Sequence, residues 1–213
     1  DHTNHKLEGA FRYNMDSGLS FDIIDQYNDR EEVNDNGISG LLYSLKDNLF
    51  SIMTTYEPSE KFKFRFDYSN YMLDYDEAFN NYRDRTDNTF AFYAFYKIKP
   101  KTSVFAEYEF ADISFDNDGS LDSEENRYYA GVDWQMTAKT LGLVKAGWIE
   151  KDFEDPSIED NDLFSLEMQI QHKFASNKAL SLTGYRKFNE TTITTASHFE
   201  TTGIRAGYQH RFN

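Results

Sequence analysis

The chain of 213 residues has no cysteine, only three prolines and no long apolar run. The lack of cysteine leaves no disulfide framework, but it fits many compartments, exported bacterial proteins included. A transmembrane helix needs about 18 or more consecutive apolar residues, and no stretch of the sequence offers them. A helical membrane span is therefore excluded, whereas a transmembrane β-barrel is not. The opening DHTNHKLEGAF also lacks the features of a signal peptide, so the protein is either not exported or its signal has been removed.

Basic residues are scarce, with 22 Lys and Arg against 37 Asp and Glu and a net charge of −15. An acidic chain is a poor nucleic-acid binder, and no Gly-rich phosphate loop is present. The five histidines are scattered, and none has a Ser or Asp spaced as a partner for a catalytic triad or dyad. The sequence therefore predicts a protein that is not an enzyme.

Aromatic residues are abundant, at 17% of the chain with 15 Tyr and 19 Phe, although the mean hydropathy of −0.74 is that of a hydrophilic protein. The segment FKFRFDYSNY shows how they are arranged: aromatic residues at every second position from Phe62 to Tyr68 alternate with Lys63, Arg65 and Asp67. Successive side chains of a strand point to opposite faces, so this pattern predicts a strand with one aromatic face and one ionic face.

The same alternation recurs along the chain and predicts about 11 strands. Short connections alternate with long polar ones. The short ones are expected at 14–18, 57–61, 99–101, 137–140 and 174–178. The long ones are expected at 29–47, 74–87, 112–125, 151–161 and 189–198. A hairpin thus repeats about every 40 residues, with no sequence repeat detected beyond this pattern.

Strict alternation of short turns and long loops is typical of transmembrane β-barrels. The long connections are acidic and the short turns mildly basic, which suits a molecule with two distinct aqueous faces. We predict an all-β protein, an antiparallel transmembrane β-barrel or a large part of one, in a single domain over residues 1–213. Because bacterial single-chain barrels usually have an even number of strands, we expect a longer barrel with at least one strand before Asp1. A soluble β-sandwich is the alternative.

The alternation assigns side chains to the two faces. The residues expected to line a lumen are Lys63, Arg65, Asp67, Glu107, Glu109, Asp133, Glu167 and Arg205. The residues expected to face lipid are Phe62, Phe64, Phe66, Tyr68, Phe90, Phe92, Tyr96 and Trp134. Lumen charges tune which solutes pass through a barrel, although a closed network of ion pairs could equally plug a narrow one.

Two loop segments suggest further sites. Read from Ser114, the segment SFDNDGSLDSEE has nearly the spacing of a calcium loop, with Asp116, Asp118, Asp122 and Glu125 as ligands. A weakly bound Ca²⁺ is the one cofactor that the sequence suggests. The second segment carries Tyr71, Tyr75, Phe79 and Tyr82, which either stack on sugars or belong to the aromatic girdle at a membrane interface.

The segment YEPSEKFKFRFDYSNYMLDYDEAFNNYRDRTDNTFAFYAFYKIKPKTSVFAEYEF, residues 56–110, and the ending TTGIRAGYQHRF resemble the porin-2 type of bacterial outer-membrane β-barrel. The resemblance is diffuse and extends over nearly the whole chain. It implies a barrel in the outer membrane of Gram-negative bacteria, often associated with export of capsular or other exopolysaccharide. Family members are usually longer, which agrees with the expectation of further strands.

Together, these observations predict a passive channel or export conduit for polar solutes or polysaccharide. A barrel that sheathes or anchors partner proteins is one alternative, and a soluble β-sandwich binding module is the other. The expected partners are membrane lipid, lipopolysaccharide and a periplasmic or extracellular protein, but no nucleic acid.

Overall fold

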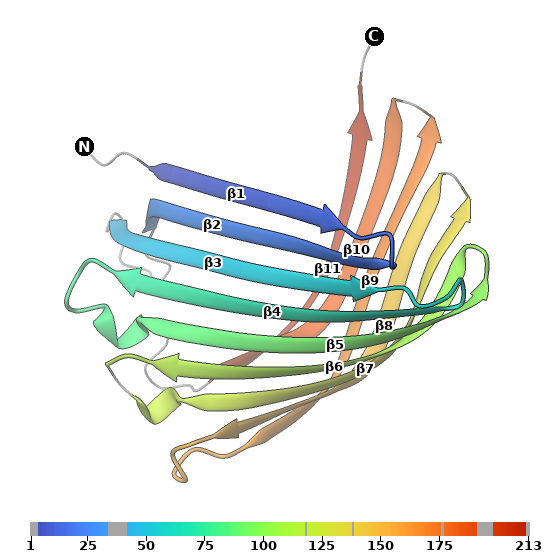
Figure 1. Ribbon diagram of the computed structural model, residues 1–213. Helices are drawn as coiled ribbons and strands as arrows, with labels where there is room; N and C mark the ends of the chain where they lie inside the picture. The colour runs from blue at the N-terminus through green and yellow to red at the C-terminus, as the bar shows by residue number, and fades with distance from the viewer. Residues whose placement is uncertain are drawn as a thin grey trace.

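The structure, a computed structural model, describes residues 4–33, 42–117, 119–137, 139–175, 177–190 and 198–211. These residues form one antiparallel sheet of 11 strands in sequence order, as the alternation predicted (Figure 1). The strands are β1 His5–Asn14, β2 Leu19–Val33, β3 Leu42–Tyr56, β4 Phe62–Tyr75, β5 Arg85–Lys99, β6 Thr102–Phe115, β7 Ser123–Thr137, β8 Thr140–Phe153, β9 Asn161–Ala175, β10 Lys178–Glu190 and β11 His198–His210. Two short 3₁₀ helices, η1 Asn81–Arg83 and η2 Gly119–Leu121, lie in the connections. Neither is long and apolar enough to cross a membrane.

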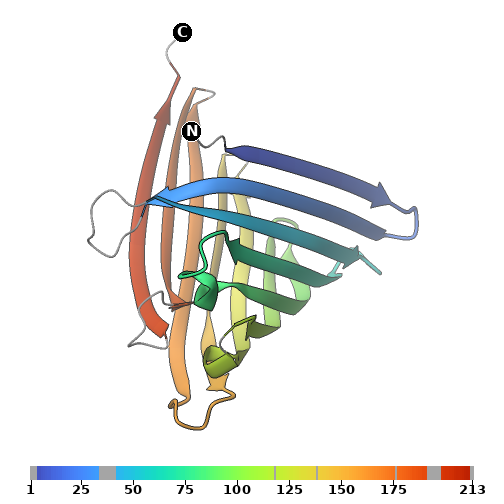
Figure 2. The ribbon, with the colours of Figure 1, turned by 90° about the vertical axis from the view of Figure 1, so that its left-hand side faces the viewer.

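The sheet curls into an open barrel wall with one concave and one convex face (Figures 1 and 2). Each strand pairs with the strand that follows it, and within the described residues β1 and β11 are the two edges. A β-sandwich requires two sheets packed face to face, and the described residues form a single sheet. The sandwich alternative is therefore wrong. The further strand expected before Asp1 stays a prediction.

The short turns fall where the sequence predicted them, and the first depends on a glycine. Gly18 has φ +79°, a left-handed conformation that glycine adopts without strain. A Cβ at Gly18 would lie 2.6 Å from the carbonyl oxygen of Glu57 in the next turn. The backbone N–H of Glu57 donates to the Gly18 carbonyl at 2.9 Å, so these two neighbouring turns are joined.

The long connections are shorter than predicted because the strands extend into them. The loop expected at 29–47 is reduced by β2, which continues to Val33, and by β3, which begins at Leu42. The loop expected at 112–125 is likewise reduced, since β6 ends at Phe115 and β7 begins at Ser123. At these ends the alternation changes face: apolar side chains such as Leu45, Ile113 and Phe115 are buried on the concave face, while the convex face is polar.

A repeated contact closes three of the long connections. In each, an Asp at the end of the loop accepts a hydrogen bond from the backbone N–H of the aromatic residue that ends the preceding strand. The pairs are Tyr75 with Asp84 at 2.7 Å, Phe115 with Asp122 at 2.6 Å and Phe153 with Asp160 at 3.0 Å. The hairpins therefore share a contact, although the sequence had suggested no repeat beyond the alternation.

The two faces of the sheet differ in how far their apolar side chains are buried. The buried apolar side chains lie on the concave face in small clusters, one of them made of Tyr129, Ile149 and Leu163. On the convex face large aromatic side chains stay exposed, with Phe66 at 45%, Phe92 at 48% and Trp148 at 49%. A continuous exposed apolar surface of this kind marks contact with a partner or a membrane.

Candidate functional site

The pairing register brings the predicted lumen residues onto the concave face. Asp67 and Glu109 both lie opposite Ala91, one on each side of β5, and residues paired directly across strands share a face. Glu167 lies opposite Lys145 and Tyr185, and Arg205 lies opposite Thr183. All eight predicted residues therefore project from the same side of the sheet.

Lys145 links two of the predicted carboxylates. Its Nζ lies 2.8 Å from Glu107 Oε1 and 3.6 Å from Glu167 Oε1, which come from β6 and β9. The ammonium also lies 4.1 Å from the centroid of the Tyr129 ring, a cation–π contact. One cation thus holds carboxylates that are 60 residues apart in the sequence (167 − 107).

A second network lies nearer the long connections. Arg127 pairs with Glu109 and with Glu125, and Lys151 Nζ lies 3.0 Å from Glu125 Oε1. The side chains of Lys151 and Glu125 are 0% and 3% exposed. Buried charges are tolerated when they are paired and hydrogen bonded, so the two side chains depend on each other.

On the opposite part of the concave face, cations lie over aromatic rings. Lys63 Nζ is 4.0 Å from the centroid of Phe95, and the Arg65 guanidinium is 4.4 Å from that of Tyr93. Arg65 Nε also donates to Asp67 at 2.8 Å, whereas Lys63 has no carboxylate partner among the described residues. The two neighbouring cations therefore differ: Arg65 is neutralised and Lys63 is not.

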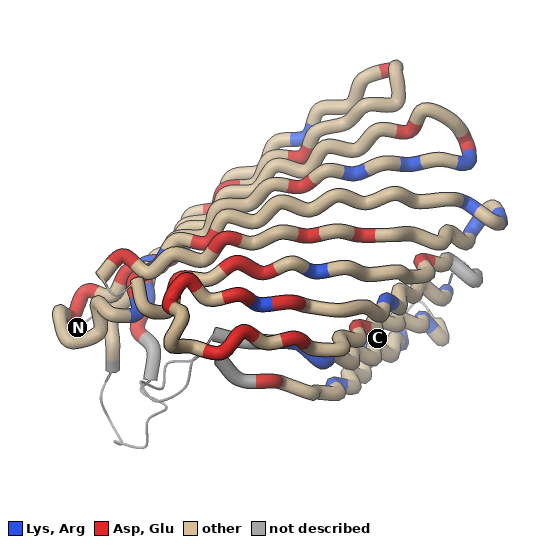
Figure 3. The backbone as a smooth tube through the Cα atoms, turned by 90° about the horizontal axis from the view of Figure 1, so that it is seen from below, with Lys and Arg blue, Asp and Glu red and all other residues tan. Residues whose placement is uncertain are grey.

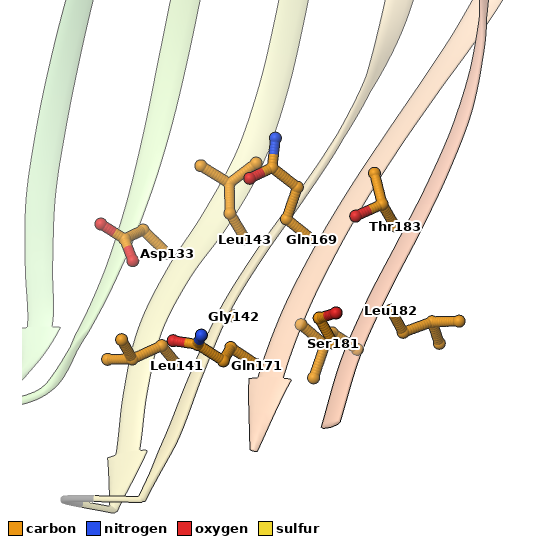
Figure 4. A pocket seen from close by; sticks show the side chains of 10 residues that line it. Asp133, Leu141, Gly142, Leu143, Gln169, Gln171, Ser181, Leu182 and Thr183 are labelled. Atoms are coloured by element: carbon orange, nitrogen blue, oxygen red, sulfur yellow. The ribbon is translucent and has the colours of Figure 1, made fainter. Parts of the chain in front are cut away.

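Three adjoining cavities form a groove along the concave face of β5 to β11. The first, about 460 Å³, is lined by amide and hydroxyl side chains such as Gln169 and Thr183, by the carboxylate of Asp133 and by apolar residues such as Leu143 (Figure 4). The second, about 520 Å³, shares Gln169 and Thr183 with the first, and adds Lys187. The third, about 280 Å³, shares Lys187 and is lined by the ion-pair networks. The groove therefore changes along its length from mixed polar and apolar side chains with one carboxylate to paired charges.

Charge is distributed unequally between the two faces. The cations on the concave face of the strands are Lys6, Arg12, Arg30, Lys63, Arg65, Arg85, Lys97, Arg127, Lys145, Lys151, Lys173, Lys187 and Arg205. Among the side chains that the structure describes, the carboxylates there are fewer: Glu8, Asp22, Asp47, Asp67, Asp87, Glu107, Glu109, Glu125, Asp133 and Glu167.

On the convex face the balance is reversed. Its carboxylates are Asp25, Asp29, Glu31, Asp74, Asp112, Glu124, Glu150, Asp152, Asp162 and Glu200. Its cations are Lys46, Lys178 and Arg186. Asp and Glu crowd the end of the sheet that carries the long connections (Figure 3). The acidic excess of the chain therefore does not reside on the concave face.

The residues predicted to face lipid lie on the convex face, where aromatic rings of neighbouring strands touch. The ring centroids of Phe62 and Tyr96 are 5.2 Å apart, and those of Tyr68 and Phe90 are 5.0 Å apart. Phe64 and Phe92 are 6.3 Å apart, and Phe66 lies opposite Phe92.

Trp134 packs differently from the other convex aromatics, because its ring lies over Gly142. A Cβ at that glycine would come within 2.4 Å of the ring. Trp148 also lies on the convex face, with its ring centroid 5.0 Å from that of Phe164, but the sequence did not predict it as a lipid-facing residue. Gly142 and Gly147 interrupt the alternation in its strand, so the sequence did not assign the faces there.

The residues proposed as calcium ligands have other contacts. Glu125 lies on β7 and pairs with Arg127 and Lys151, while Asp122 accepts the hydrogen bond from Phe115. The backbone N–H of Asp116 donates to the Asp84 carbonyl at 3.0 Å, and Asp118 lies outside the described residues. Among the described residues no three His, Asp or Glu side chains gather as a metal site.

The aromatic-rich loop does not supply a lipid-facing girdle. Tyr71 and Tyr75 lie on the concave face, opposite Leu49 and Leu45, so assigning them to the lipid interface was wrong. Tyr75 is buried against Tyr43 and Leu45, and the Arg83 guanidinium lies 4.2 Å from the centroid of its ring. These rings therefore pack within the fold.

Comparison with known proteins identifies the family. The family model described as "Putative beta-barrel porin 2" matches residues 60–213. Among solved structures, a KdgM porin in complex with disordered oligogalacturonate is 9% identical, over 99% of this chain and 100% of that one, with a TM-score of 0.42. That score is too low to establish a shared fold, and no curated protein matches the chain. The family match covers well over half of the sequence, and the chain therefore belongs to this family of β-barrel porins.

Proposed function

We propose that the protein is a passive channel or export conduit of the outer membrane for polar solutes or polysaccharide. Its family indicates a membrane channel and not an enzyme. The observation that carries the proposal is the contrast between the faces: an ionic and hydrogen-bonding groove on the concave face, and exposed aromatic rings on the convex face. In this proposal the concave face lines the lumen, and the convex face contacts lipid and lipopolysaccharide.

The amide and hydroxyl side chains of the first cavity support a hydroxyl-rich substrate. Gln169, Gln171, Ser181 and Thr183 supply both donors and acceptors along neighbouring strands β9 and β10. A solute with many hydroxyl groups can exchange hydrogen bonds from one such side chain to the next, so it passes without losing all its partners at once. No step requires a cofactor.

A scaffold barrel that anchors partner proteins is the second candidate. The observation that favours it is the closed network of Glu109, Arg127, Glu125 and Lys151, which satisfies these charges within the wall. If comparable networks filled the whole lumen, no solute would pass.

Single-channel conductance of the detergent-purified protein in a planar bilayer separates the two candidates. We expect stable current steps that a neutral oligosaccharide, dextran, blocks reversibly, because the solute occupies the groove. Replacing Gln169 and Thr183 by Ala should shorten the blocks, whereas the matched pair Leu166→Ala and Leu180→Ala on the convex face, which lines none of the three cavities, should not. Absence of current from protein that still shows heat-modifiable migration would contradict the channel and leave the scaffold.

A further inference from the structure

The charges of the concave face that have no opposite partner are mainly cationic, although the chain carries a net charge of −15. We propose that the conduit selects anions, and that its substrate is an anionic solute or a polymer bearing acidic groups. This inference rests on the proposed function and assigns the selectivity to Lys63, Lys187 and Arg205.

Most concave-face charges cancel locally. Arg30 Nε lies 3.1 Å from Asp47, Arg85 Nε lies 3.3 Å from Asp87, and Lys145 holds Glu107. An ion pair of this kind presents little net charge to a passing solute, because the two fields oppose each other within a few ångströms. Selectivity is therefore decided by the charges outside such pairs.

Three positive charges of this kind lie beside an aromatic ring or opposite a residue of the groove. The Lys63 Nζ lies 4.0 Å from the centroid of the Phe95 ring and the Lys187 Nζ lies 5.9 Å from that of the Tyr185 ring, so both ammonium groups contact an aromatic ring. Arg205 is exposed and lies opposite Thr183, which lines the first cavity. Within the described part of the chain, none of the three has a carboxylate within ion-pair distance.

The charge of opposite sign is Asp133, which lines the first cavity without a cationic partner among the described residues. It reduces the positive excess but does not remove it. Lys97 and Lys173, nearer the short turns, add to the cationic side.

The acidic side chains of the long connections attract cations, whereas the unpaired cations of the concave face attract anions. The two regions therefore have opposite effects on ion selectivity. At an ionic strength of about 0.1 M, exposed charges act over a screening length of about 10 Å. The loops stand in water at one end of the sheet, whereas the wall charges face a confined path with low-dielectric walls, which focuses their field. The wall should therefore decide the selectivity at ordinary salt, and the loops should weaken it only in dilute salt.

The reversal potential of single channels in a KCl gradient tests this inference. We expect the wild-type protein to pass Cl⁻ more readily than K⁺. The variant Lys63→Gln, Lys187→Gln and Arg205→Gln should reduce the Cl⁻ to K⁺ permeability ratio about threefold or more, because it removes the positive excess of the concave face. Replacing Asp133 by Asn should raise the ratio.

A matched control removes the same charges from the convex face. The variant Lys46→Gln, Lys178→Gln and Arg186→Gln also loses two lysines and one arginine, and it should keep the wild-type ratio. Preference of the wild type for K⁺, or an unchanged ratio in the concave-face variant, would overturn the inference while leaving the channel intact. A folded protein without conductance would instead overturn the proposed function itself.

Discussion

At the scale of residues, the buried ion pair of Lys151 and Glu125 stabilises part of the concave face. The side chain of Lys151 is 0% exposed, and its ammonium is held by Glu125, which also pairs with Arg127. A charge removed from water is costly unless its partner is present. The stability of this part of the concave face therefore depends on both residues together more than on either alone.

Replacing Lys151 by Met should destabilise the protein by about 3–5 kcal/mol, because Glu125 keeps a buried charge with one partner fewer. The double variant Glu125→Gln and Lys151→Met should recover much of that loss, since both charges are then gone. Urea unfolding in detergent micelles measures both differences. Removing the exposed cation Arg186, which pairs with Glu200 at 2.9 Å, is the control and should cost about 0–1 kcal/mol. Strictly additive effects of the two substitutions would contradict the coupling.

At the scale of elements, three of the long connections are closed by an aspartate. Asp84 performs this role between β4 and β5, where it is buried and accepts the Tyr75 N–H. Burial raises the pKa of the Asp84 carboxyl above its ordinary value, while the hydrogen bond from Tyr75 opposes the shift. The protonated form is therefore the one that folding favours.

A carboxyl whose folded pKa is raised gives its full stabilising contribution below the unfolded pKa and loses it as the pH rises through the folded pKa. The neutral variant Asp84→Asn keeps an acceptor for Tyr75, so its stability relative to wild type should increase from acidic to neutral pH. Unfolding free energies of both proteins across that range measure this trend. Replacing Asp84 by Ala should cost about 1–3 kcal/mol, because the Tyr75 N–H loses its partner. A difference between wild type and Asp84→Asn that does not change with pH would contradict the argument.

The sequence predicted the elements well wherever one face is apolar. The alternation from Phe62 to Tyr68 fixed both the strand and its faces, because only one register keeps the aromatic rings together. It could not predict strand ends such as Glu124, where both faces are polar. It also could not predict that Lys145 meets Glu107, since that contact depends on how separate hairpins align.

Across the whole molecule, one curved sheet separates two environments. Leu182 and Thr183 are adjacent on β10 and both border the first cavity, yet by the register the side chain of Leu182 projects from the convex face and that of Thr183 from the concave face. If the convex face contacts lipid, a charged side chain in place of Leu182 should destabilise the protein, whereas one in place of Thr183 should not.

Replacing Leu182 by Lys should destabilise the protein in lipid vesicles by about 2–4 kcal/mol, the cost of a lysine facing the bilayer midplane. Replacing Thr183 by Lys should cost far less, because that side chain meets water in the groove. Reversible unfolding in vesicles compares the two neighbours at nearly the same depth. Equal costs, or a larger cost at Thr183, would mean that the faces are assigned the wrong way round.

The sequential order of the strands has a consequence for how the protein forms. Every strand pairs with its neighbour in the chain, so each step of assembly closes only the short loop of one hairpin. Closing a short loop costs less chain entropy than joining distant segments, and topologies with local contacts fold faster. The sheet can therefore grow one hairpin at a time from any point.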